Sequence, residues 1–455
     1  MKVIIIGAQG GGMTAAARLK RNLPSAEVVV YDAQEYVSFG ACGLPYYIGN
    51  FFSEERNLFA RTVEQLQESG LRVFIKHKVV SVDEKSQTVV VKNLTTGITH
   101  TEGYDKLIIA SGATPRDREL CNNTNTFTVK TLHDAHALKA KLATGSVKSV
   151  SILGAGFIGL ELLEAFKNIE GIQEINLIDF KHNISDNILD NNFEETLEKE
   201  LRKHHINIYL KAHVEHIDNG GVSVKITAHN HIGDSFNVDS DILIVSKGFI
   251  PNTHFLENIP FAKLPNGALL VDREGKTNIA NIYAIGDCAS VYHKILAQDV
   301  YIPLATVANK MGRVVADSIA GVDSKFTGSI GSSMLKVLDL EIGKTGITEY
   351  EAKKHKIPYH ATTVEDYNHT NYYPNNAKIW MKVLTNPETG IILGAQILGK
   401  NNTVLRIHAL SVAVEKGLTV DELGMLDFAY APPFTRTWEA LNILGGVASS
   451  KAKKG

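Results

Sequence analysis

Short apolar runs that stop at glycine open the chain. Residues 2–7, KVIIIG, form a β-branched run that is typical of a buried parallel strand. Residues 11–22, GGMTAAARLKRN, have helical composition, and EVVVYD at 27–32 indicates the next strand, so these segments predict a βαβ unit. The same order returns where SVSILGAGFIGLELLEAFKN at 149–168 precedes EINLIDF at 174–180. The pattern therefore predicts an α/β protein with two Rossmann-like dinucleotide-binding folds.

The patterning changes elsewhere along the chain. Alternation in RVFIKHKVVSVD (72–83) and TVVVKNL (88–94) predicts antiparallel strands. Further stretches in which a strand runs into glycine occupy residues 104–116, 241–253 and 281–290. From about residue 323, alternating strands mix with the helical segment TVLRIHALSVAVEKG, which predicts a third domain of the α+β class.

The second glycine motif has the spacing of a dinucleotide-binding turn. It consists of Gly154, Gly156 and Gly159, and Asp179 follows the last glycine by twenty residues. The first glycine permits a tight turn, the second lets the backbone approach a pyrophosphate, and the third lets the helix pack on the strand. The helix start offers free N–H groups to phosphate. Because Asp179 ends the next strand, it is predicted to accept a hydrogen bond from a ribose 2′-hydroxyl.

The first glycine motif is looser. Its glycines are Gly7, Gly10, Gly11 and Gly12. Gln9 replaces the usual middle glycine, and Asp32 again follows twenty residues after the last glycine. The context predicts a second dinucleotide site, with a glycine-rich helix start that binds nothing as the alternative. A flavin is favoured because the strand in NIYAIGDCAS runs into Gly286 and Asp287, where a carboxylate could accept hydrogen bonds from a ribityl chain.

Composition and charge exclude several classes of partner. The chain has 455 residues, enough for about three domains of ~150 residues. Its 47 basic and 49 acidic residues give a net charge of −2, which argues against nucleic acid or an anionic membrane as the main partner. No apolar run reaches the ~18 residues of a membrane span, and the N-terminal run is too short for a signal peptide. Three cysteines are few and odd in number, so a reducing cytoplasm is predicted.

A single cysteine lies in the small-residue segment SFGACGLPYYIG, residues 38–49. No second cysteine is close in sequence to Cys42, so any disulfide partner would come from outside the chain. Reactivity needs a thiolate. Pro45 suits the first turn of a helix, which predicts that Cys42 lies at a helix N-terminus where the dipole lowers the pKa of its thiol. The alternative, a small buried hydrophobic residue, is preferred for Cys121 and Cys288.

Six segments together carry a family resemblance: SFGACGLPYYIG, ASGATPR, GAGFIGLE, NIYAIGDCA, PLATVANKMGR and YAPPF. The chain resembles the pyridine nucleotide–disulfide oxidoreductases over nearly its whole length. Within them it is most similar to the single-cysteine branch of coenzyme A-disulfide reductases, NADH oxidases and persulfide reductases. The resemblance implies an FAD-binding domain at 1–115 and 246–322, an NAD(P)-binding domain at 116–245, and a dimerisation domain at 323–455.

The resemblance also implies roles for individual residues. Phe157 would cover the flavin until nicotinamide displaces it, and Asp287 would bind the ribityl chain. In a homodimer, Tyr430 with Tyr373 or Tyr372 would project towards Cys42 of the other subunit. Further residues placed at the cofactors are Val79, Ser111, Gly112, Ile158, Gly248, Leu304 and Ala305. Ser38, Arg18 and Arg21 would contact the substrate, the arginines through coenzyme A phosphates, with a solvated helix face as their alternative.

Some positions depart from the coenzyme A-disulfide reductase pattern. Ala41 stands where those enzymes commonly have asparagine, and Trp438 with Glu439 stands where they often have a Lys-Asp pair. Both changes would remove polar contacts to a pantetheine or a phosphate. The first glycine loop also lacks the histidine of typical water-forming NADH oxidases. The electron acceptor is therefore open.

Three functional hypotheses follow. The first is a flavoprotein that passes electrons from NAD(P)H through FAD to Cys42 and reduces coenzyme A disulfide or a related persulfide. The second is an NAD(P)H oxidase that reduces oxygen to water through a cysteine sulfenate, and the third is a non-catalytic flavin redox sensor. NADH is favoured over NADPH because Asp179 would repel a 2′-phosphate, although Lys181 and His182 could soften or reverse this preference. No metal is expected.

Overall fold

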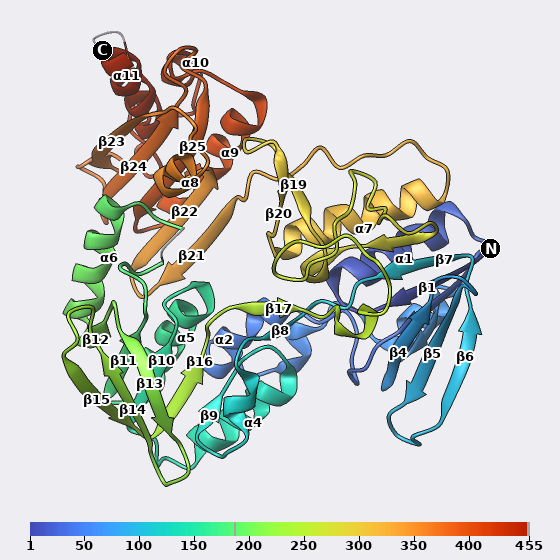
Figure 1. Cartoon of the computed structure of the whole chain (residues 1–455). Helices are drawn as coiled ribbons and strands as arrows, with labels where there is room; N and C mark the ends of the chain where they lie inside the picture. The colour runs from blue at the N-terminus through green and yellow to red at the C-terminus, as the bar shows by residue number, and fades with distance from the viewer. Residues whose placement is uncertain (186–187, 453–455) are drawn as a thin grey trace.

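The computed structural model describes residues 1–185 and 188–452, which form three units, each built around its own β-sheet (Figure 1). The first sheet has the order β18-β7-β1-β2-β3, and its strands run parallel. Its strands are β1 (Lys2–Ile6), β2 (Glu27–Tyr31), β3 (Arg72–Phe74), β7 (Lys106–Ile109) and β18 (Ile282–Ala284). Helices α1 (Gly10–Asn22) and α7 (Ala305–Ile319) pack together on it. Because β18 and α7 come late in the sequence, two separate stretches of chain assemble this unit.

One predicted strand of this unit is divided in the structure. Residues 72–83 were expected to be antiparallel throughout, but β3 joins the parallel sheet, and only β4 (His77–Asp83) pairs antiparallel with β5 (Thr88–Asn93). Lys76 has a φ of +53°, which turns the chain between the two strands. Strand β6 (Thr99–Gly103) completes the small sheet. The smaller elements of the unit are α3 (Val63–Glu68), β19 (Val291–His293) and β20 (Gln298–Val300).

The second unit repeats the parallel architecture. Its sheet has the order β12-β11-β10-β16-β9. The strands are β9 (Thr126–Phe127), β10 (Ser149–Leu153), β11 (Glu174–Ile178), β12 (Ile206–Tyr209) and β16 (Ile242–Val245). The helices are α4 (Leu132–Ala143), α5 (Phe157–Lys167) and α6 (Asn191–Lys203), and an antiparallel sheet adds β13 (His213–Asp218), β14 (Val224–His229) and β15 (Ser235–Ser240). The predicted βαβ unit β10-α5-β11 is confirmed.

Two connections join the first and second units side by side. Strand β8 (Ala113–Pro115) leads out of the first unit, and β17 (Phe249–Pro251) returns to it, paired antiparallel with β8. The short helix α2 (Leu44–Ile48) belongs to the first stretch of sequence, yet its Leu44 and Ile48 are buried in the core of the second unit. The segment that carries Cys42 therefore lies between the two units. The domain boundaries at 115/116, 245/246 and 322/323 stay a prediction.

The third unit is an antiparallel sheet covered by helices. Its order is β21-β22-β25-β24-β23. The strands are β21 (Ser333–Val337), β22 (Leu340–Gly346), β23 (His360–Tyr367), β24 (Lys378–Thr385) and β25 (Ile392–Gly399). The helices are α8 (Glu349–Lys354), α9 (Ile407–Lys416), α10 (Val420–Met425) and α11 (Ala440–Ala452). The predicted α+β character after residue 323 is confirmed.

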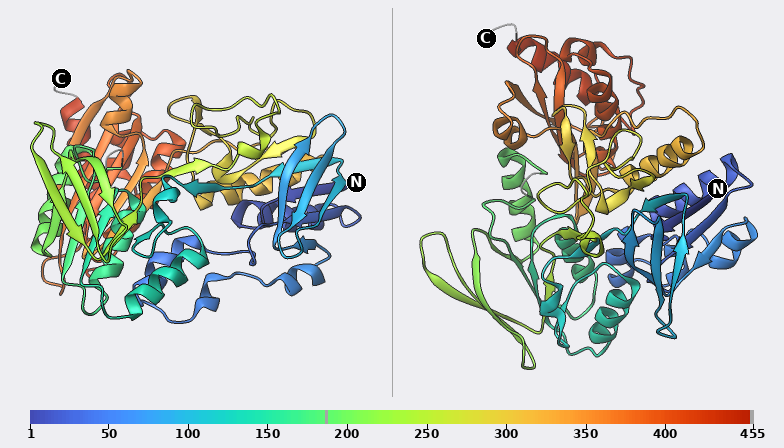
Figure 2. Two further views of the ribbon diagram at one scale, coloured as in Figure 1. Left: turned by 60° about the horizontal axis from the view of Figure 1, so that its bottom comes forward. Right: turned by 45° about the vertical axis from the view of Figure 1, so that its right-hand side comes forward.

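Lysines tie the second unit to the third, where α6 lies against the third sheet (Figures 1 and 2). The Nζ of Lys382 on β24 lies 3.0 Å from an Asp190 oxygen just before α6, and the Nζ of Lys400 lies 2.8 Å from an oxygen of Glu200 on α6. Lys336 on β21 pairs with Glu164 on α5. Lys382 is only 2% exposed, so this contact is part of the interior.

The fold class predicted from the sequence is confirmed, with two Rossmann-like units and a third α+β unit. Each parallel sheet supplies a core of fully buried strand residues. Among the described residues, no helix has both the length and the apolar character that crossing a bilayer requires.

Candidate active site

The first glycine loop connects β1 to α1 through close backbone approaches. A Cβ on Gly7 would lie 2.2 Å from the carbonyl oxygen of Ala110, and a Cβ on Gly12 would lie 2.0 Å from that of Gly7. Gly10 and Gly11 form the first turn of α1, whose N-cap residue Gln9 makes no side-chain cap. The first N–H groups of α1 are thus left to a ligand such as phosphate.

Asp32 fixes this loop from the end of β2. Its Oδ2 accepts a hydrogen bond from Ala8 N at 2.6 Å, and its Oδ1 accepts one from Gln34 N at 2.7 Å. Burial raises the pKa of Asp32, and these hydrogen bonds oppose the rise. Gln9 also donates to Asp32, and its Oε1 accepts from Phe39 N at 3.0 Å. Gln9, a departure from the glycine motif, therefore ties the loop to the segment that carries Cys42.

The second glycine loop repeats this geometry. Asp179 accepts from Ala155 N at 2.7 Å with Oδ2 and from Lys181 N at 2.9 Å with Oδ1, as Asp32 does in the first loop. A Cβ on Gly159 would lie 2.0 Å from the carbonyl oxygen of Gly154, whose φ is +114°. A Cβ on Gly156 would meet no atom within 4 Å, so open space lies beside that backbone. Both loops fit a dinucleotide, since each leaves an uncapped helix start.

Asp287 follows Gly286 in a short 3-10 helix that faces the linker to α4. Its Oδ2 lies 3.3 Å from Nζ of Lys130, and that Nζ lies 4.8 Å from the ring centre of Phe249. The hydroxyl of Tyr301 donates to the Asp287 carbonyl oxygen at 3.0 Å. The sequence did not point to Lys130, because no motif surrounds it and only the fold brings it to Asp287.

Most of the other residues predicted at the cofactors lie on the connections between the first and second units or at helix starts. Ser111 Oγ donates to the carbonyl oxygen of Asn252 at 2.7 Å, which ties the stretch after β7 to the stretch after β17. Gly112 and Gly248 have φ values of +69° and +92° and open space where a Cβ would stand. Val79 is 5% exposed within the first core. Leu304 is the N-cap of α7 and Ala305 its first residue, while Phe157 and Ile158 begin α5 and pack against the second core.

Cys42 lies in a short 3-10 helix, Ala41–Gly43, that leads into α2, and the predicted position at a helix start is confirmed. Its side chain is exposed, and the backbone around it is tightly held. Gly40 N donates to Leu58 O at 2.7 Å, and a Cβ on Gly43 would lie 2.4 Å from the Leu58 side chain. Ser38, with a φ of +52°, donates from its N–H to Ala8 O at 2.9 Å, so the first glycine loop borders this segment.

The predicted lowering of the Cys42 pKa is wrong. The surrounding protein atoms raise the pKa of the thiol by desolvation, and the charge of Glu161 adds to this, while Lys130 opposes it. The expected dipole effect is weak because α2 has only five residues. Cys121 is partly buried, and burial raises the pKa of its thiol to about 11, whereas Cys288 is fully buried. Those two cysteines therefore fit the alternative, in which a cysteine serves as a small hydrophobic packing residue.

Glu161 is a titratable residue that sequence reasoning missed. It lies on α5 one turn after Phe157, and burial, aided by the charge of Glu164, raises the pKa of its carboxyl group to about 7. Burial, aided by the charges of Glu161 and Glu164, raises the pKa of Tyr46 in α2 to about 12. A signal was present in GFIGLELLE, because Glu161 is four residues from Phe157 and therefore shares its helix face.

The three predicted tyrosines lie on the third unit. The hydroxyl groups of Tyr372 and Tyr430 are 3.1 Å apart, and these side chains are 71% and 42% exposed. Tyr373 instead meets the ring of His369 edge to face, with ring centres 5.7 Å apart. Among the described residues, no hydrogen bond links these tyrosines to Cys42 of the same chain, and α2 lies far from the loop between α10 and α11 (Figure 1).

Comparison with known proteins places this geometry in a family. A model of the pyridine nucleotide-disulphide oxidoreductases matches residues 1–312, and a model of their dimerisation domain matches residues 332–441. The chain belongs to the pyridine nucleotide-disulphide oxidoreductase family. It is a flavin-dependent NAD(P)H oxidoreductase, and its cofactors are FAD and NAD(P)H.

Relatives of this oxidoreductase match over its full length. It is 33% identical to an NADH oxidase of Enterococcus faecalis, over 98% of this chain and 99% of the relative. It is 30% identical to a coenzyme A disulfide reductase of Staphylococcus aureus, with the same coverage of both chains. The structure of a water-forming NADH oxidase from Lactobacillus brevis, bound to NADH, is 30% identical with a TM-score of 0.94, covering 100% of this chain and 99% of that one. The predicted resemblance is confirmed.

The two arginines predicted on α1 of the oxidoreductase differ in their surroundings. Arg18 makes a two-pronged contact with Asp317 on α7, Nε to Oδ1 at 2.7 Å and Nη2 to Oδ2 at 3.1 Å. This contact lowers the pKa of Asp317. Arg21 is exposed, and no ion pair is recorded for it within residues 1–185 and 188–452. Arg21 is thus the better placed of the two to meet a phosphate, and substrate contact by either stays a prediction.

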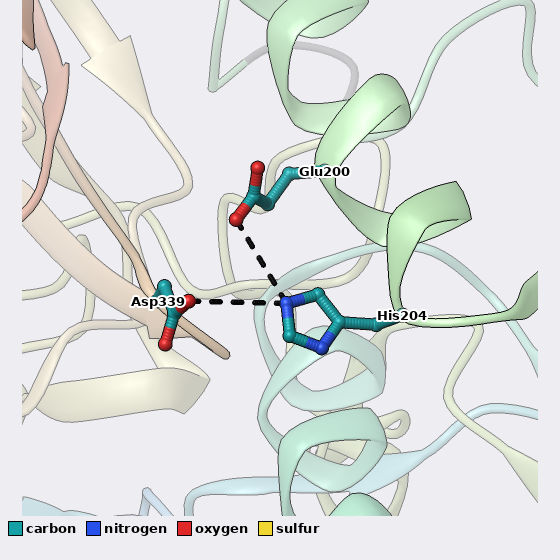
Figure 3. Close-up of side chains that lie close together, drawn as sticks. All are labelled: Glu200, His204 and Asp339. Carbon is teal, nitrogen blue, oxygen red and sulfur yellow. Dashed lines mark ion pairs between the residues drawn. The ribbon is translucent and has the colours of Figure 1, made fainter.

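Glu200, His204 and Asp339 form the single group in the described part of the oxidoreductase that could hold a metal ion (Figure 3). The His204 Nε2 lies 3.8 Å from Glu200 and 3.9 Å from Asp339. Lys400 already contacts both carboxylates, at 2.8 Å and 3.3 Å. Its ammonium group supplies the positive charge that these carboxylates need, so we assign no metal to this group.

Proposed function

We propose that this oxidoreductase reduces coenzyme A disulfide, or a coenzyme A persulfide, with electrons from NAD(P)H delivered to Cys42. The observation that carries the proposal is the exposed Cys42 thiol in a segment tied to the first glycine loop, with the other two cysteines buried or partly buried elsewhere. Since no internal disulfide partner is within reach in the sequence, the disulfide must come from outside. A reducing cytoplasm suits such thiol chemistry.

The proposed reaction is a two-electron reduction of a disulfide to two thiols. FAD, when bound, carries two electrons from NAD(P)H to sulfur. The Cys42 thiolate attacks one sulfur of the disulfide, the substrate S–S bond breaks, and a mixed disulfide forms while the first thiolate leaves and takes a proton. Two electrons then break the mixed disulfide, which restores the Cys42 thiolate and releases the second thiolate, and that thiolate takes a second proton to leave as the thiol. Lys130 favours that thiolate by its charge, whereas Glu161 and Asp287 oppose it.

A homodimer supplies the proposed proton donors. The match to the dimerisation domain supports assembly of two chains. Tyr372 and Tyr430 lie exposed on the third unit, away from Cys42 of their own chain, so we propose that they face Cys42 of the other subunit. Ser38 lies four residues before Cys42 in the same segment, and the exposed Arg21 offers its guanidinium to a coenzyme A phosphate.

A second candidate function is the reduction of oxygen to water through a Cys42 sulfenate. The full-length similarity to an NADH oxidase of Enterococcus faecalis favours it. A flavin redox sensor without turnover is the third hypothesis from the sequence.

Steady-state NADH consumption separates these functions. We expect turnover without oxygen when coenzyme A disulfide or persulfide is added, and a mass increase on Cys42 that equals one coenzyme A. Turnover in air without added disulfide, with a sulfenic or sulfinic adduct on Cys42, would favour the oxidase. No turnover with any small acceptor would favour the sensor.

We also propose a preference for NADH. Asp179 is held by two backbone N–H groups at the end of β11, where it can accept from a free 2′-hydroxyl and repel a 2′-phosphate. In Asp179→Ala, the ratio of kcat/KM for NADH to that for NADPH should fall by about tenfold or more. Equal efficiency of the wild-type enzyme with both coenzymes would refute this proposal.

A further inference from the structure

Two exposed loops bring Tyr372 and Tyr430 together, and we call these two residues the tyrosine pair. Tyr372 lies between β23 and β24, and Tyr430 lies between α10 and α11. Their hydroxyl groups are 3.1 Å apart although 58 residues separate them in sequence. Because both rings are exposed, core packing does not hold them in place. Loops on a surface keep such a geometry only when other contacts tie them together.

Arg406 supplies contacts to both loops. It lies at the end of a short 3-10 helix, Thr403–Arg406, directly before α9. Its Nη2 donates to the carbonyl oxygen of Asn368 at 2.6 Å, at the base of the Tyr372 loop, and to that of Phe434 at 3.2 Å, in the Tyr430 loop. The guanidinium also pairs with Glu439, Nη2 to Oε2 at 3.1 Å. The Arg406 side chain is 14% exposed and that of Glu439 is 6% exposed, so this contact is largely closed to water.

Further hydrogen bonds connect the bases of the two loops to the parts that hold the tyrosines. Asn368 pairs with Ala377 across the base of its loop, since Ala377 N donates to Asn368 Oδ1 at 2.9 Å. Thr370 Oγ1 donates to the carbonyl oxygen of Pro432 at 3.0 Å, which links the loops two residues from each tyrosine. Arg406 therefore fixes the bases of both loops, and Thr370 aligns their tips.

We propose that Arg406 is a positioning residue that holds the tyrosine pair in hydrogen-bond contact, ready to protonate the thiolate that leaves Cys42 of the other subunit. This rests on the proposed function of Tyr372 and Tyr430. A guanidinium holds its N–H donors in one rigid plane, so it can contact both oxygens of Glu439 while it meets the two carbonyl oxygens. An ammonium group presents its three donors from a single nitrogen on a flexible stem and does not match this planar geometry.

The hydroxyl groups of the tyrosine pair share one hydrogen bond, in which either can be the donor. The hydroxyl that accepts this bond keeps its own proton free for the leaving thiolate. In that transfer its O–H bond breaks and an S–H bond forms, and the resulting tyrosinate, stabilised by the other hydroxyl, is reprotonated from solvent.

The test compares Arg406→Lys and Arg406→Met in the FAD-loaded protein. Because a misplacement of about 1 Å can cost ~100-fold in rate, we expect kcat with coenzyme A disulfide to fall at least tenfold in both. Stopped-flow reduction of the bound flavin by NADH should stay unchanged, since that step does not involve the tyrosine pair. Arg202→Met is the matched control, because Arg202 forms an exposed ion pair with Glu198 on α6, and it should keep full turnover.

A mutant cycle separates positioning from general stability. In a Tyr372→Phe/Tyr430→Phe background, Arg406→Lys should cause no further loss, because the hydroxyls it positions are gone. An equal loss in that background, or full turnover of Arg406→Lys in the otherwise wild-type protein, would overturn the inference.

Two further outcomes also decide the inference. If Tyr372→Phe/Tyr430→Phe alone keeps wild-type turnover, the proposed role of the tyrosines fails and the inference falls with it. If Arg406→Met does not fold, as judged by gel filtration and thermal unfolding, Arg406→Lys and Glu439→Gln decide, because both keep polar groups of similar size at the buried contact.

Discussion

At the scale of single residues, the Cys42 thiol is balanced between opposing influences. Desolvation and the charge of Glu161 disfavour the thiolate, and Lys130 favours it. The same Lys130 pairs with Asp287, so one cation serves both the thiol and the residue predicted to bind the flavin chain. The pKa of the Cys42 thiol therefore depends first on desolvation and then on charges that the second unit brings in, and the helix start alone does not set it.

Substitution of Cys42 tests whether its sulfur carries the electrons. Cys42→Ser should keep flavin binding and flavin reduction by NADH, and should lower disulfide reduction by at least a hundredfold, since no thiolate remains to form the mixed disulfide. Stopped-flow flavin reduction and steady-state turnover measure the two steps. Cys121→Ser is the matched control and should behave as wild type. Wild-type disulfide turnover by Cys42→Ser would make Cys42 a packing residue.

Glu161 predicts a pH dependence of stability. Its pKa rises from an ordinary 4.5 to about 7 on folding, so between these values the native state binds more protons than the unfolded state. Stability from this group is present in full below pH 4.5 and is lost as pH rises through 7. Glu161→Gln removes the cost of ionising the carboxyl group, so its Tm should match wild type near pH 4.5 and exceed it at pH 8.

Thermal unfolding across this pH range checks the Glu161 prediction. Glu170→Gln is a suitable control, because Glu170 is exposed just beyond α5 and should show no such difference. A constant Tm difference at all pH values would contradict the assignment.

At the scale of elements, the two dinucleotide loops are held in the same way, and the second combines a packing glycine with a binding glycine. The backbone amide of Ala8 or Ala155 bonds to the acid at the end of the next strand in the same way in both loops. In the second loop, Gly159 brings α5 against the loop, while Gly156 borders open space. Stability and cofactor binding should therefore depend on different glycines of one loop.

Two alanine substitutions separate those roles. Gly159→Ala places a Cβ 2.0 Å from the Gly154 carbonyl oxygen, so it should lower the Tm of the protein by several degrees. Gly156→Ala meets no protein atom within 4 Å and should leave the Tm unchanged, but raise KM for NADH by about tenfold by blocking the close backbone approach. Thermal unfolding and NADH kinetics are measured on both variants. Similar effects of both substitutions on both quantities would refute the division of roles.

At the scale of the whole molecule, buried charges join the second unit to the third. Lys382 lies between Asp190 and Glu349, and Gln396 makes two hydrogen bonds with Asp190. A buried ion pair of this kind is costly to break from one side, because the remaining charge is left without its partner. The contact should therefore control how firmly the second unit is held on the third unit.

Lys382→Met should lower the free energy of unfolding by about 3–5 kcal/mol, because it leaves the buried Asp190 carboxylate without its cation. Adding Asp190→Asn should recover part of the loss. Lys378→Met is the control, since Lys378 and its partner Glu365 are about half exposed, and it should cost about 1 kcal/mol or less. Urea unfolding followed by fluorescence measures all three. A loss no larger than that of the control would show that the buried contact contributes little.

The sequence by itself determined the two βαβ units, their glycine loops and the acids that follow them, because these depend on local strand and helix patterning and on fixed spacing. It also determined the helix start at Cys42, through Pro45. The family followed from motifs that are contiguous in sequence. The division of residues 72–83 between two sheets was missed, since Lys76 turns the chain there and alternation alone does not reveal a left-handed residue.

Only the tertiary structure decided which distant groups meet. Lys130 reaches Asp287 across 157 residues, Arg406 reaches both tyrosine loops, and Tyr372 rather than Tyr373 pairs with Tyr430. The direction of the Cys42 pKa was likewise decided by the fold, because desolvation and the field of Glu161 act through space and outweigh the dipole of a five-residue helix. Spacing in sequence fixes local geometry, whereas burial and charge at a site depend on every element that packs around it.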